Sequence, residues 1–202
     1  MPNALIFDVD GVLADSEPIS ISTLNQAFRE SHGIELTDED SLDFMGATAR
    51  RHVGGIVEKY GLDADIEAIV ERHESLFIST IQSAESVPIR DSVDLFKKMV
   101  DREDWLVGIA TSSSRQRSTA TLTACGIQEE EIDAWLTGDD ITSPKPNPEI
   151  YIACALAIGV PPADCVVIED SVAGVASAKA AGMTCIALTG TFPGEQLNAA
   201  DR

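Results

Sequence analysis

The stretch Ala4-Leu-Ile-Phe-Asp-Val-Asp-Gly-Val-Leu-Ala-Asp15 decides how the rest of the chain is interpreted. Its first four residues form a short apolar run that is typical of a buried parallel strand, and the run ends in two carboxylates, Asp8 and Asp10. Side chains two positions apart on a strand point the same way, so both acids can serve one pocket at the strand's carboxyl end. Gly11 then allows a turn with positive φ. The alternative interpretation is an acidic strand-to-loop turn, in which Asp-Gly pairs are common.

Three further stretches place polar side chains where a predicted strand ends, or in a loop that precedes a helix. They contribute hydroxyls, a lysine and a second pair of acids: Thr111 and Ser112, Lys145, and Glu169 and Asp170. Taken singly, the hydroxyls and the second acid pair suit helix caps, and the lysine suits a solvated surface. The prolines beside Lys145 fix its loop, however, which a freely solvated lysine does not require.

Together these stretches resemble the haloacid dehalogenase superfamily, in the branch that holds β-phosphoglucomutases, phosphoglycolate phosphatases and related sugar phosphatases. The matching segments follow the family's order and approximate spacing over nearly the whole chain: Asp8-Val-Asp-Gly-Val-Leu-Ala-Asp15, Ile109-Ala-Thr-Ser112, Lys145-Pro-Asn-Pro-Glu-Ile-Tyr151 and Ile168-Glu-Asp-Ser-Val-Ala-Gly174. Any one segment alone would be a weak match. Their joint occurrence is what identifies the chain as similar to this family.

The order of the predicted elements gives the fold class. Beyond the first strand, predicted helices alternate with strands at 106–111, 134–136, 165–169 and 184–188. This alternation predicts an α/β fold, a Rossmann-like parallel sheet of about five strands with helices on both faces. We expect residues 1–15 and 85–202 to form this core domain.

Residues 16–84 have a different character. They show helical patterns and no convincing strand, and we expect glycines to separate the helices: Gly33, Gly46, Gly54 with Gly55, and Gly61. We therefore predict an inserted all-helical domain over residues 16–84. In the resembling branch this position holds a helical cap over the active site, with hinge strands near 15–17 and 84–88.

Composition limits the partners. The chain of 202 residues has 14 basic and 34 acidic residues, a net charge of −20. Nucleic acids and anionic membranes need a basic footprint, so we expect neither as a partner. A salt-rich habitat is one explanation of the acidity, and a heavily solvated surface is the simpler one. An anionic substrate would need a locally positive site.

The lack of a recognisable targeting signal in this sequence and the setting of its cysteines lead us to expect a cytoplasmic protein. No apolar run reaches the roughly 18 residues that a membrane span needs, and the N-terminus lacks the pattern of a signal peptide. The four cysteines lie in apolar surroundings without a Cys-x-x-Cys pair, so we interpret them as reduced core residues. We expect a monomer or a weak homodimer.

The resemblance implies a role for each polar residue of the core. Asp8 would be the nucleophile that forms an aspartyl-phosphate. Asp10 would protonate the leaving oxygen and then activate water as a base. Thr111 and the amides of Ser112 and Gly11 would donate hydrogen bonds to phosphoryl oxygens, and the fixed positive charge would come from the lysine, Lys145.

The resemblance also implies a Mg²⁺ site. Its oxygen ligands would be the Asp8 carboxylate, the Asp10 carbonyl, Glu169 and Asp170, a hard donor set that suits this ion. The ion would offset the repulsion between an incoming phosphate and Asp8.

Substrate specificity is expected in the cap, around Phe44-Met-Gly-Ala-Thr-Ala-Arg-Arg51. The resembling stretch in relatives is a loop that approaches the substrate. Gly46 in this loop and Arg50 are the candidate substrate-binding residues. Arg50 is chosen because a guanidinium can hold a phosphate or carboxylate by two hydrogen bonds. The alternative is that Arg50 lies on a solvated helix face.

Single residues select among the chemistries of the family. True dehalogenases lack the acid that this chain has at Asp10, and they lack the metal-binding acid pair. The mutases carry a cap histidine where Ser20 stands here, so we expect water as the acceptor. We predict a Mg²⁺-dependent phosphatase that hydrolyses a small phosphomonoester, a sugar phosphate or a phosphoglycolate-like compound. The alternatives are a β-phosphoglucomutase-like sugar phosphomutase and a non-catalytic ligand-binding protein of the same fold.

Overall fold

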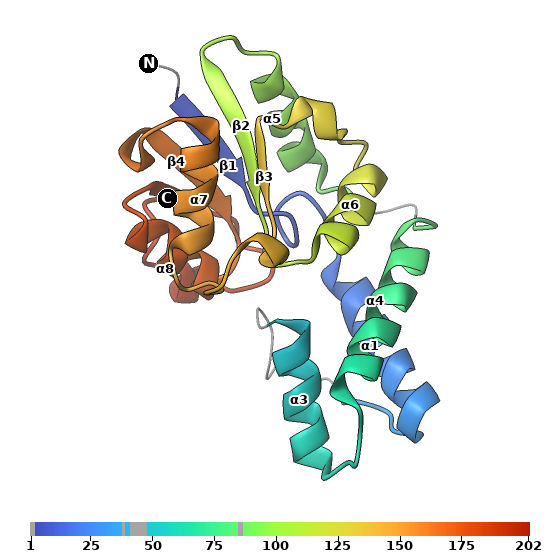
Figure 1. Cartoon of the computed structure of the whole chain (residues 1–202). Helices are drawn as coiled ribbons and strands as arrows, with labels where there is room; N and C mark the ends of the chain where they lie inside the picture. Colours follow the sequence, from blue (N-terminus) through green and yellow to red (C-terminus); the bar gives the residue numbers. More distant parts are fainter. Residues whose placement is uncertain (1–2, 38, 41–47, 85–86) are drawn as a thin grey trace. The chain divides into compact units, whose positions relative to one another are not determined.

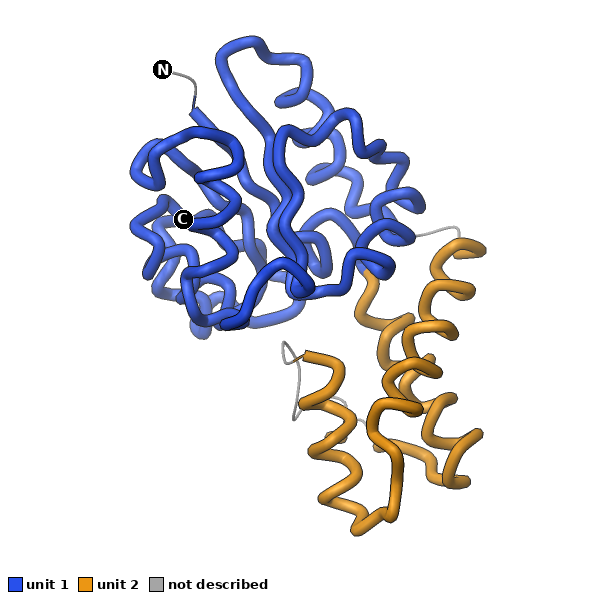
Figure 2. The backbone as a smooth tube through the Cα atoms, in the orientation of Figure 1, with its two compact units in different colours: residues 1–15, 86–202 blue, residues 16–85 orange. Residues whose placement is uncertain are grey.

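The computed structural model describes residues 3–37, 39–40, 48–84 and 87–202. The chain divides into two compact units, a larger one of residues 1–15 with 86–202 and a helical one of residues 16–85 (Figure 2). Within the described ranges, no helix is long and apolar enough to cross a membrane.

The larger unit is built on a parallel sheet of five strands in the order β3-β2-β1-β4-β5 (Figure 1). The strands are β1 (Asn3–Phe7), β2 (Trp105–Ala110), β3 (Ala134–Leu136), β4 (Cys165–Glu169) and β5 (Thr184–Ala187). The central strand β1 is buried at four of its five positions. A strand covered on both faces carries a continuous apolar run, as the sequence has there. The predicted α/β class and its parallel sheet are confirmed.

Four helices of the larger unit connect these strands: α5 (Arg90–Val100), α6 (Arg115–Ala124), α7 (Glu149–Ile158) and α8 (Val172–Ala180). Short 3-10 helices complete the connections: η1 (Glu129–Glu131), η2 (Gly138–Asp140), η3 (Pro162–Asp164) and η4 (Gly194–Leu197). Figure 1 shows α7 and α8 on one side of the sheet and α5 and α6 on the other. Alternate residues of β1 face the two layers, so Ile6 packs in the cluster of α7 while the ring of Phe7 meets Phe96 of α5.

The chain leaves and re-enters the larger unit at neighbouring residues. The Asp15 amide donates to the Val87 carbonyl at 2.8 Å, and the Ile89 amide donates to the Leu13 carbonyl at 2.9 Å. An antiparallel bridge between Ala14 and Pro88 lies between these two bonds. The hinge strands expected near 15–17 and 84–88 overlap this bridged pair only at Asp15 and at 87–88, and their role as a hinge stays a prediction.

The described part of the helical unit contains α1 (Glu17–His32), α3 (Ala49–Tyr60) and α4 (Ile66–Ile81). Their apolar faces meet in one cluster: Leu24, Ala27, Phe28, Val53, Ile56, Ile69 and Leu76. Gly33 and Gly61 end α1 and α3 with φ of 68° and 61°, a conformation in which glycine ends helices without strain.

The expectation that Gly54 and Gly55 separate two helices is wrong, because both lie inside α3. A glycine inside a helix costs only about 1 kcal/mol relative to alanine. Val53 and Ile56, on either side of the pair, are fully buried, and their packing outweighs this cost.

Asp40 is a fully buried carboxylate in the helical unit. Its Oδ2 accepts hydrogen bonds from the Thr37 amide at 2.7 Å and the Tyr60 hydroxyl at 2.7 Å, and Lys59 Nζ lies 2.8 Å from its Oδ1. Burial alone would raise the pKa of Asp40, but the contacts with Lys59, Thr37 and Tyr60 outweigh it and hold this pKa well below its usual range. The ionised carboxylate thus ties the segment before α3 to the end of that helix.

Replacing Phe96 by alanine tests the packing of α5 on the sheet. The ring is fully buried, and its centroid lies 5.5 Å from that of Phe7, so we expect Phe96→Ala to lower the free energy of unfolding by about 3–5 kcal/mol. Trp105 and Trp135 both lie in the larger unit, so tryptophan fluorescence in urea follows that unit. Leu95→Ala on the same helix is the control, since Leu95 is 37% exposed. Equal losses in the two variants would contradict the packing we describe.

The Asp40 contacts predict an acid-sensitive helical unit. A carboxyl whose folded pKa is depressed adds stability that is fully present above its unfolded value of about 3.9 and is lost as the pH falls toward the folded value. We expect the free energy of unfolding of Asp40→Asn to be lower than that of the wild type at pH 6, and the difference between the two to shrink below about pH 4. Urea unfolding followed by far-UV circular dichroism measures this free energy at each pH. Asp63→Asn, at an exposed acid of the same unit, should show no such narrowing.

Candidate active site

The predicted polar residues of the core gather at the carboxyl edge of the sheet. Asp8 follows β1, Thr111 follows β2, and Glu169 is the last residue of β4. The register pairs Phe7 with Ile168 on one side and with Ile109 on the other. Asp8 and Glu169 follow Phe7 and Ile168 directly and therefore lie side by side, and Thr111 follows two residues after Ile109, just beyond the end of β2.

The loop after β1 depends on Gly11. Its φ is 78°, and a Cβ there would lie 1.8 Å from Asp170 Oδ2, so both the backbone and the space require glycine. The Gly11 amide donates to the Ala14 carbonyl at 2.8 Å. We expected this amide to donate to a phosphoryl oxygen, but in this structure it is engaged within the loop. The contribution that the structure shows for Gly11 is to let Asp170 approach.

Lys145 lies between two carboxylates. Its Nζ is 2.6 Å from Asp8 Oδ1, 2.7 Å from Glu169 Oε1 and 3.1 Å from the Ala110 carbonyl, so three acceptors match the three donors of the ammonium. The side chain is only 5% exposed. Burial would lower the pKa of Lys145, but Asp8 and Glu169 outweigh it and raise this pKa, so the lysine carries its charge at any physiological pH.

Both oxygens of Glu169 are engaged by donors. Oε1 accepts from Lys145 and, at 2.9 Å, from the Tyr151 hydroxyl. Oε2 accepts from the amides of Asp170 and Ser171, each at 2.9 Å, and from the Ser171 hydroxyl. A Cβ at Gly174 would lie 1.6 Å from Oε1, so glycine at this position makes room for the carboxylate. These contacts favour Glu169 as the residue that holds Lys145; its predicted part as a metal ligand stays a prediction.

Asp170 is buried beside Glu169. Its Oδ2 accepts a hydrogen bond from the Thr191 hydroxyl, which the loop after β5 supplies. Burial raises the pKa of Asp170 to about 7, and the negative charge of Glu169 acts in the same direction.

The carboxylates at this edge carry more negative charge than Lys145 offsets. Burial raises the pKa of Asp8 well above its usual value; Lys145 opposes this, and Glu169, Asp170 and Asp10 add to it. Within the described residues, no group of three or more His, Cys, Asp or Glu is arranged to hold a metal ion. The donor set is nevertheless one that a hard divalent cation prefers, and Asp8 and Asp170 are destabilised as anions in the way a cation would relieve.

Asp10, in the loop after β1, is hydrogen-bonded by a residue of the loop after β2. The Ser113 hydroxyl donates to Asp10 Oδ2 at 2.7 Å, and the Ser113 amide donates to the Thr111 hydroxyl at 3.1 Å. The structure therefore brings Thr111 and Asp10 into one network, with Ser112 between the two bonded residues of the loop. We did not predict a role for Ser113, although it follows Ser112 directly in the sequence.

The candidates in the helical unit stand differently. Arg50 lies in the first turn of α3, is 72% exposed in its side chain and forms an ion pair with Glu67. This placement is the solvated helix face that we gave as its alternative, and substrate binding by Arg50 stays a prediction. Gly46 lies outside the described residues. Ser20 lies in α1, where its carbonyl is 3.1 Å from His73 Nε2.

Sequence comparison places the chain among known proteins. A profile of the family described as haloacid dehalogenase-like hydrolase matches residues 5–188. The chain is 35% identical over 194 residues to SUPPRESSOR OF QUENCHING 1, chloroplastic, of Arabidopsis thaliana, which covers 94% of this chain and 18% of that protein. It is 32% identical over 186 residues to fructose-1-phosphate phosphatase YqaB of Escherichia coli (strain K12), covering 90% of this chain and 94% of that one.

Solved structures agree with this placement. The crystal structure of CbbY from Rhodobacter sphaeroides in complex with phosphate matches with a TM-score of 0.91 and 26% identity, covering 100% of this chain and 93% of that one. The resemblance drawn from the sequence motifs is confirmed. The chain belongs to the haloacid dehalogenase-like hydrolase family, in its phosphatase-like group of phosphoric monoester hydrolases.

Proposed function

We propose that this chain hydrolyses a small phosphomonoester through an aspartyl-phosphate on Asp8, with Mg²⁺ as its cofactor. The observation that carries the proposal is the ammonium of Lys145, held 2.6 Å from Asp8 Oδ1 in a buried position at the carboxyl edge of the sheet. On a chain with a net charge of −20, this fixed cation would act together with a bound Mg²⁺ to offset the carboxylates and to attract a phosphate at short range.

In the first step, a carboxylate oxygen of Asp8 attacks the phosphorus and the bond from phosphorus to the ester oxygen breaks. Asp10 gives its proton to that oxygen, which leaves as an alcohol. Lys145 stays charged throughout and stabilises the negative charge on the phosphoryl oxygens. Thr111 and the Ser112 amide are proposed to donate hydrogen bonds to the same oxygens.

In the second step, water attacks the phosphorus and the bond to Asp8 breaks. Asp10 takes a proton from this water, which returns Asp10 to its starting state and releases inorganic phosphate. The hydrogen bond from Ser113 to Asp10 Oδ2 orients the carboxylate for both transfers.

Mg²⁺ would supply charge neutralisation between the substrate phosphate and the carboxylates. Asp8, Asp170 and the Asp10 carbonyl are the proposed ligands, because the two carboxylates are those whose pKa is raised by burial and by neighbouring acids. Glu169 is less suited to this part, since donors already engage both of its oxygens.

A sugar phosphate is the proposed substrate class. The relative from Escherichia coli is a fructose-1-phosphate phosphatase, and the matched CbbY structure holds phosphate. Residues near Arg50 in the helical unit are the proposed contacts with the sugar. Isomerisation of a sugar 1-phosphate without release of phosphate would instead support the mutase.

Asp8→Asn tests the nucleophile. The substitution keeps the shape of the side chain and removes its charge, so we expect phosphate release from a panel of sugar phosphates to fall by about 10³-fold or more. Mass spectrometry of the acid-quenched wild type should show the gain of one phosphoryl group on the peptide that contains Asp8. Asp164→Asn, at an exposed acid before β4, is the control. Release that survives in Asp8→Asn would rule out the aspartyl-phosphate.

Asp170→Asn tests the cation site. Loss of a ligand charge should raise the Mg²⁺ concentration for half-maximal activity by at least about 10- to 100-fold, the range seen when only an outer partner of a metal ligand is lost. Calorimetric titration with Mg²⁺ should weaken in parallel. Asp164→Asn, at the other end of β4, should match the wild type in both measurements. If Asp170→Asn also matched the wild type, Asp170 would not be a ligand.

A further inference from the structure

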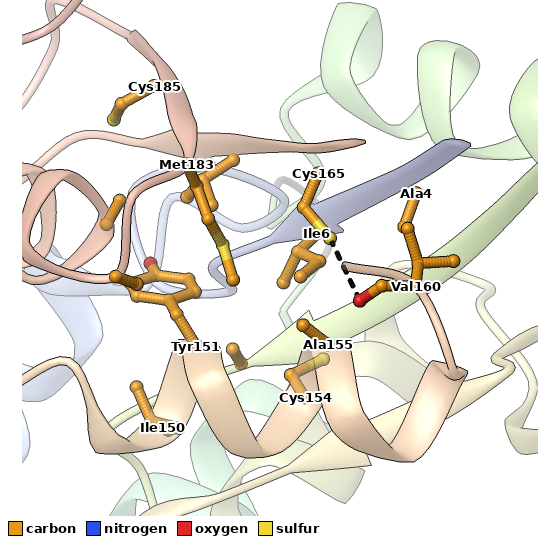
Figure 3. Packing of buried hydrophobic residues seen from close by; sticks show 14 of the residues in the cluster. Ala4, Ile6, Ile150, Tyr151, Cys154, Ala155, Val160, Cys165, Met183 and Cys185 are labelled. Carbon is orange, nitrogen blue, oxygen red and sulfur yellow. Dashed lines mark hydrogen bonds between the residues drawn. The ribbon is translucent and has the colours of Figure 1, made fainter. Parts of the chain in front are cut away.

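Tyr151 is a fully buried residue of α7 to which the motifs gave no role. Figure 3 shows its ring projecting from α7 among the apolar side chains of the core cluster, which includes Ile6 and Met183. Phenylalanine would fill the same apolar space. The hydroxyl is therefore the part of the side chain that packing does not explain.

The hydroxyl of Tyr151 reaches the charged network of the site. It donates to Glu169 Oε1 at 2.9 Å, the same oxygen that lies 2.7 Å from Lys145 Nζ. The ammonium of Lys145 also lies 4.9 Å from the centroid of the Tyr151 ring, within the range of a cation–π contact. One side chain thus touches both partners of the ion pair.

This double contact has a physical effect on Lys145. Glu169 Oε1 divides its negative charge between two donors, so it attracts the ammonium less strongly than it would with the lysine alone. Lys145 is shared between Glu169 and Asp8, and a weaker attraction to Glu169 leaves it closer to Asp8. The ring face restricts the ammonium from a third direction.

We infer that Tyr151 is a positioning residue that acts through Glu169 to keep the Lys145 ammonium against Asp8. The inference rests on the proposed function, in which Lys145 stabilises charge on the phosphoryl group. It predicts a loss in turnover more than in substrate affinity, because the charge that Lys145 meets grows in the transition state.

Tyr151→Phe is the first test. It keeps the ring and removes the donor to a carboxylate, so we expect kcat to fall about tenfold with KM changed less than about twofold. The chain has two tyrosines, and Tyr60 donates to the Asp40 carboxylate in the helical unit. Tyr60→Phe makes the same chemical change away from Asp8 and should leave kcat within about twofold of the wild type. Equal kcat values for the two variants would overturn the inference.

A second test asks whether Tyr151 acts through Glu169. If it does, adding Tyr151→Phe to Glu169→Gln should lower kcat by less than about twofold, because the carboxylate that the hydroxyl serves is already gone. The same loss in both backgrounds would show that Tyr151 contributes independently of Glu169, and the inference would fail.

A third measurement does not depend on turnover or on the folding of Tyr151→Phe. In Tyr60→Phe labelled with 3-fluorotyrosine, the single fluorine resonance belongs to Tyr151. Inorganic phosphate should shift this resonance, because the bound anion attracts the Lys145 ammonium that contacts the ring. A resonance that does not move on addition of phosphate would overturn the inference. If the wild type released no phosphate from any ester while the resonance still shifted, the proposed function would fail and the contact would stand.

Discussion

The contact of one ammonium with two buried carboxylates is the interaction on which the rest of the site depends. Removing such charges from water is unfavourable unless each finds close partners, and Lys145 meets Asp8 and Glu169 at 2.6 and 2.7 Å. The acids come from strands that are neighbours in the sheet, in a register that pairs Phe7 with Ile168. A slip of one residue would turn each side chain to the opposite face, so the strand register and the charge network require each other.

A buried cation stands at the proposed phosphate site of a strongly acidic chain. The chain carries a net charge of −20, yet its buried lysine stands where a phosphate is proposed to bind. Long-range attraction cannot bring an anion to such a surface, and salt would screen the repulsion. Binding would therefore have to rely on contacts at short distance, such as those proposed for Thr111 and the Ser112 amide.

Much of the fold could be predicted from the sequence because its signals are local. Apolar runs, turn glycines and prolines mark the strands and the ends of helices, and the acids at strand ends mark the site. The prediction that Gly54 and Gly55 separate two helices failed, because the packing of α3 outweighs the low helix propensity of glycine. The partners Tyr151, Ser113 and Thr191 leave no local signal either: Ser113 meets Asp10 from 103 residues away along the chain. Only the sheet topology brings such residues together.

The bridged crossing at Ala14 and Pro88 has a consequence for how this architecture can vary. The two segments that flank the helical unit are already hydrogen-bonded to each other, from Leu13 with Ile89 to Asp15 with Val87. A short turn could close the chain there without breaking a bond of the sheet. Inserts of different length and sequence could therefore be exchanged at this one point of the larger unit. The residues that carry the proposed chemistry would keep their contacts within that unit.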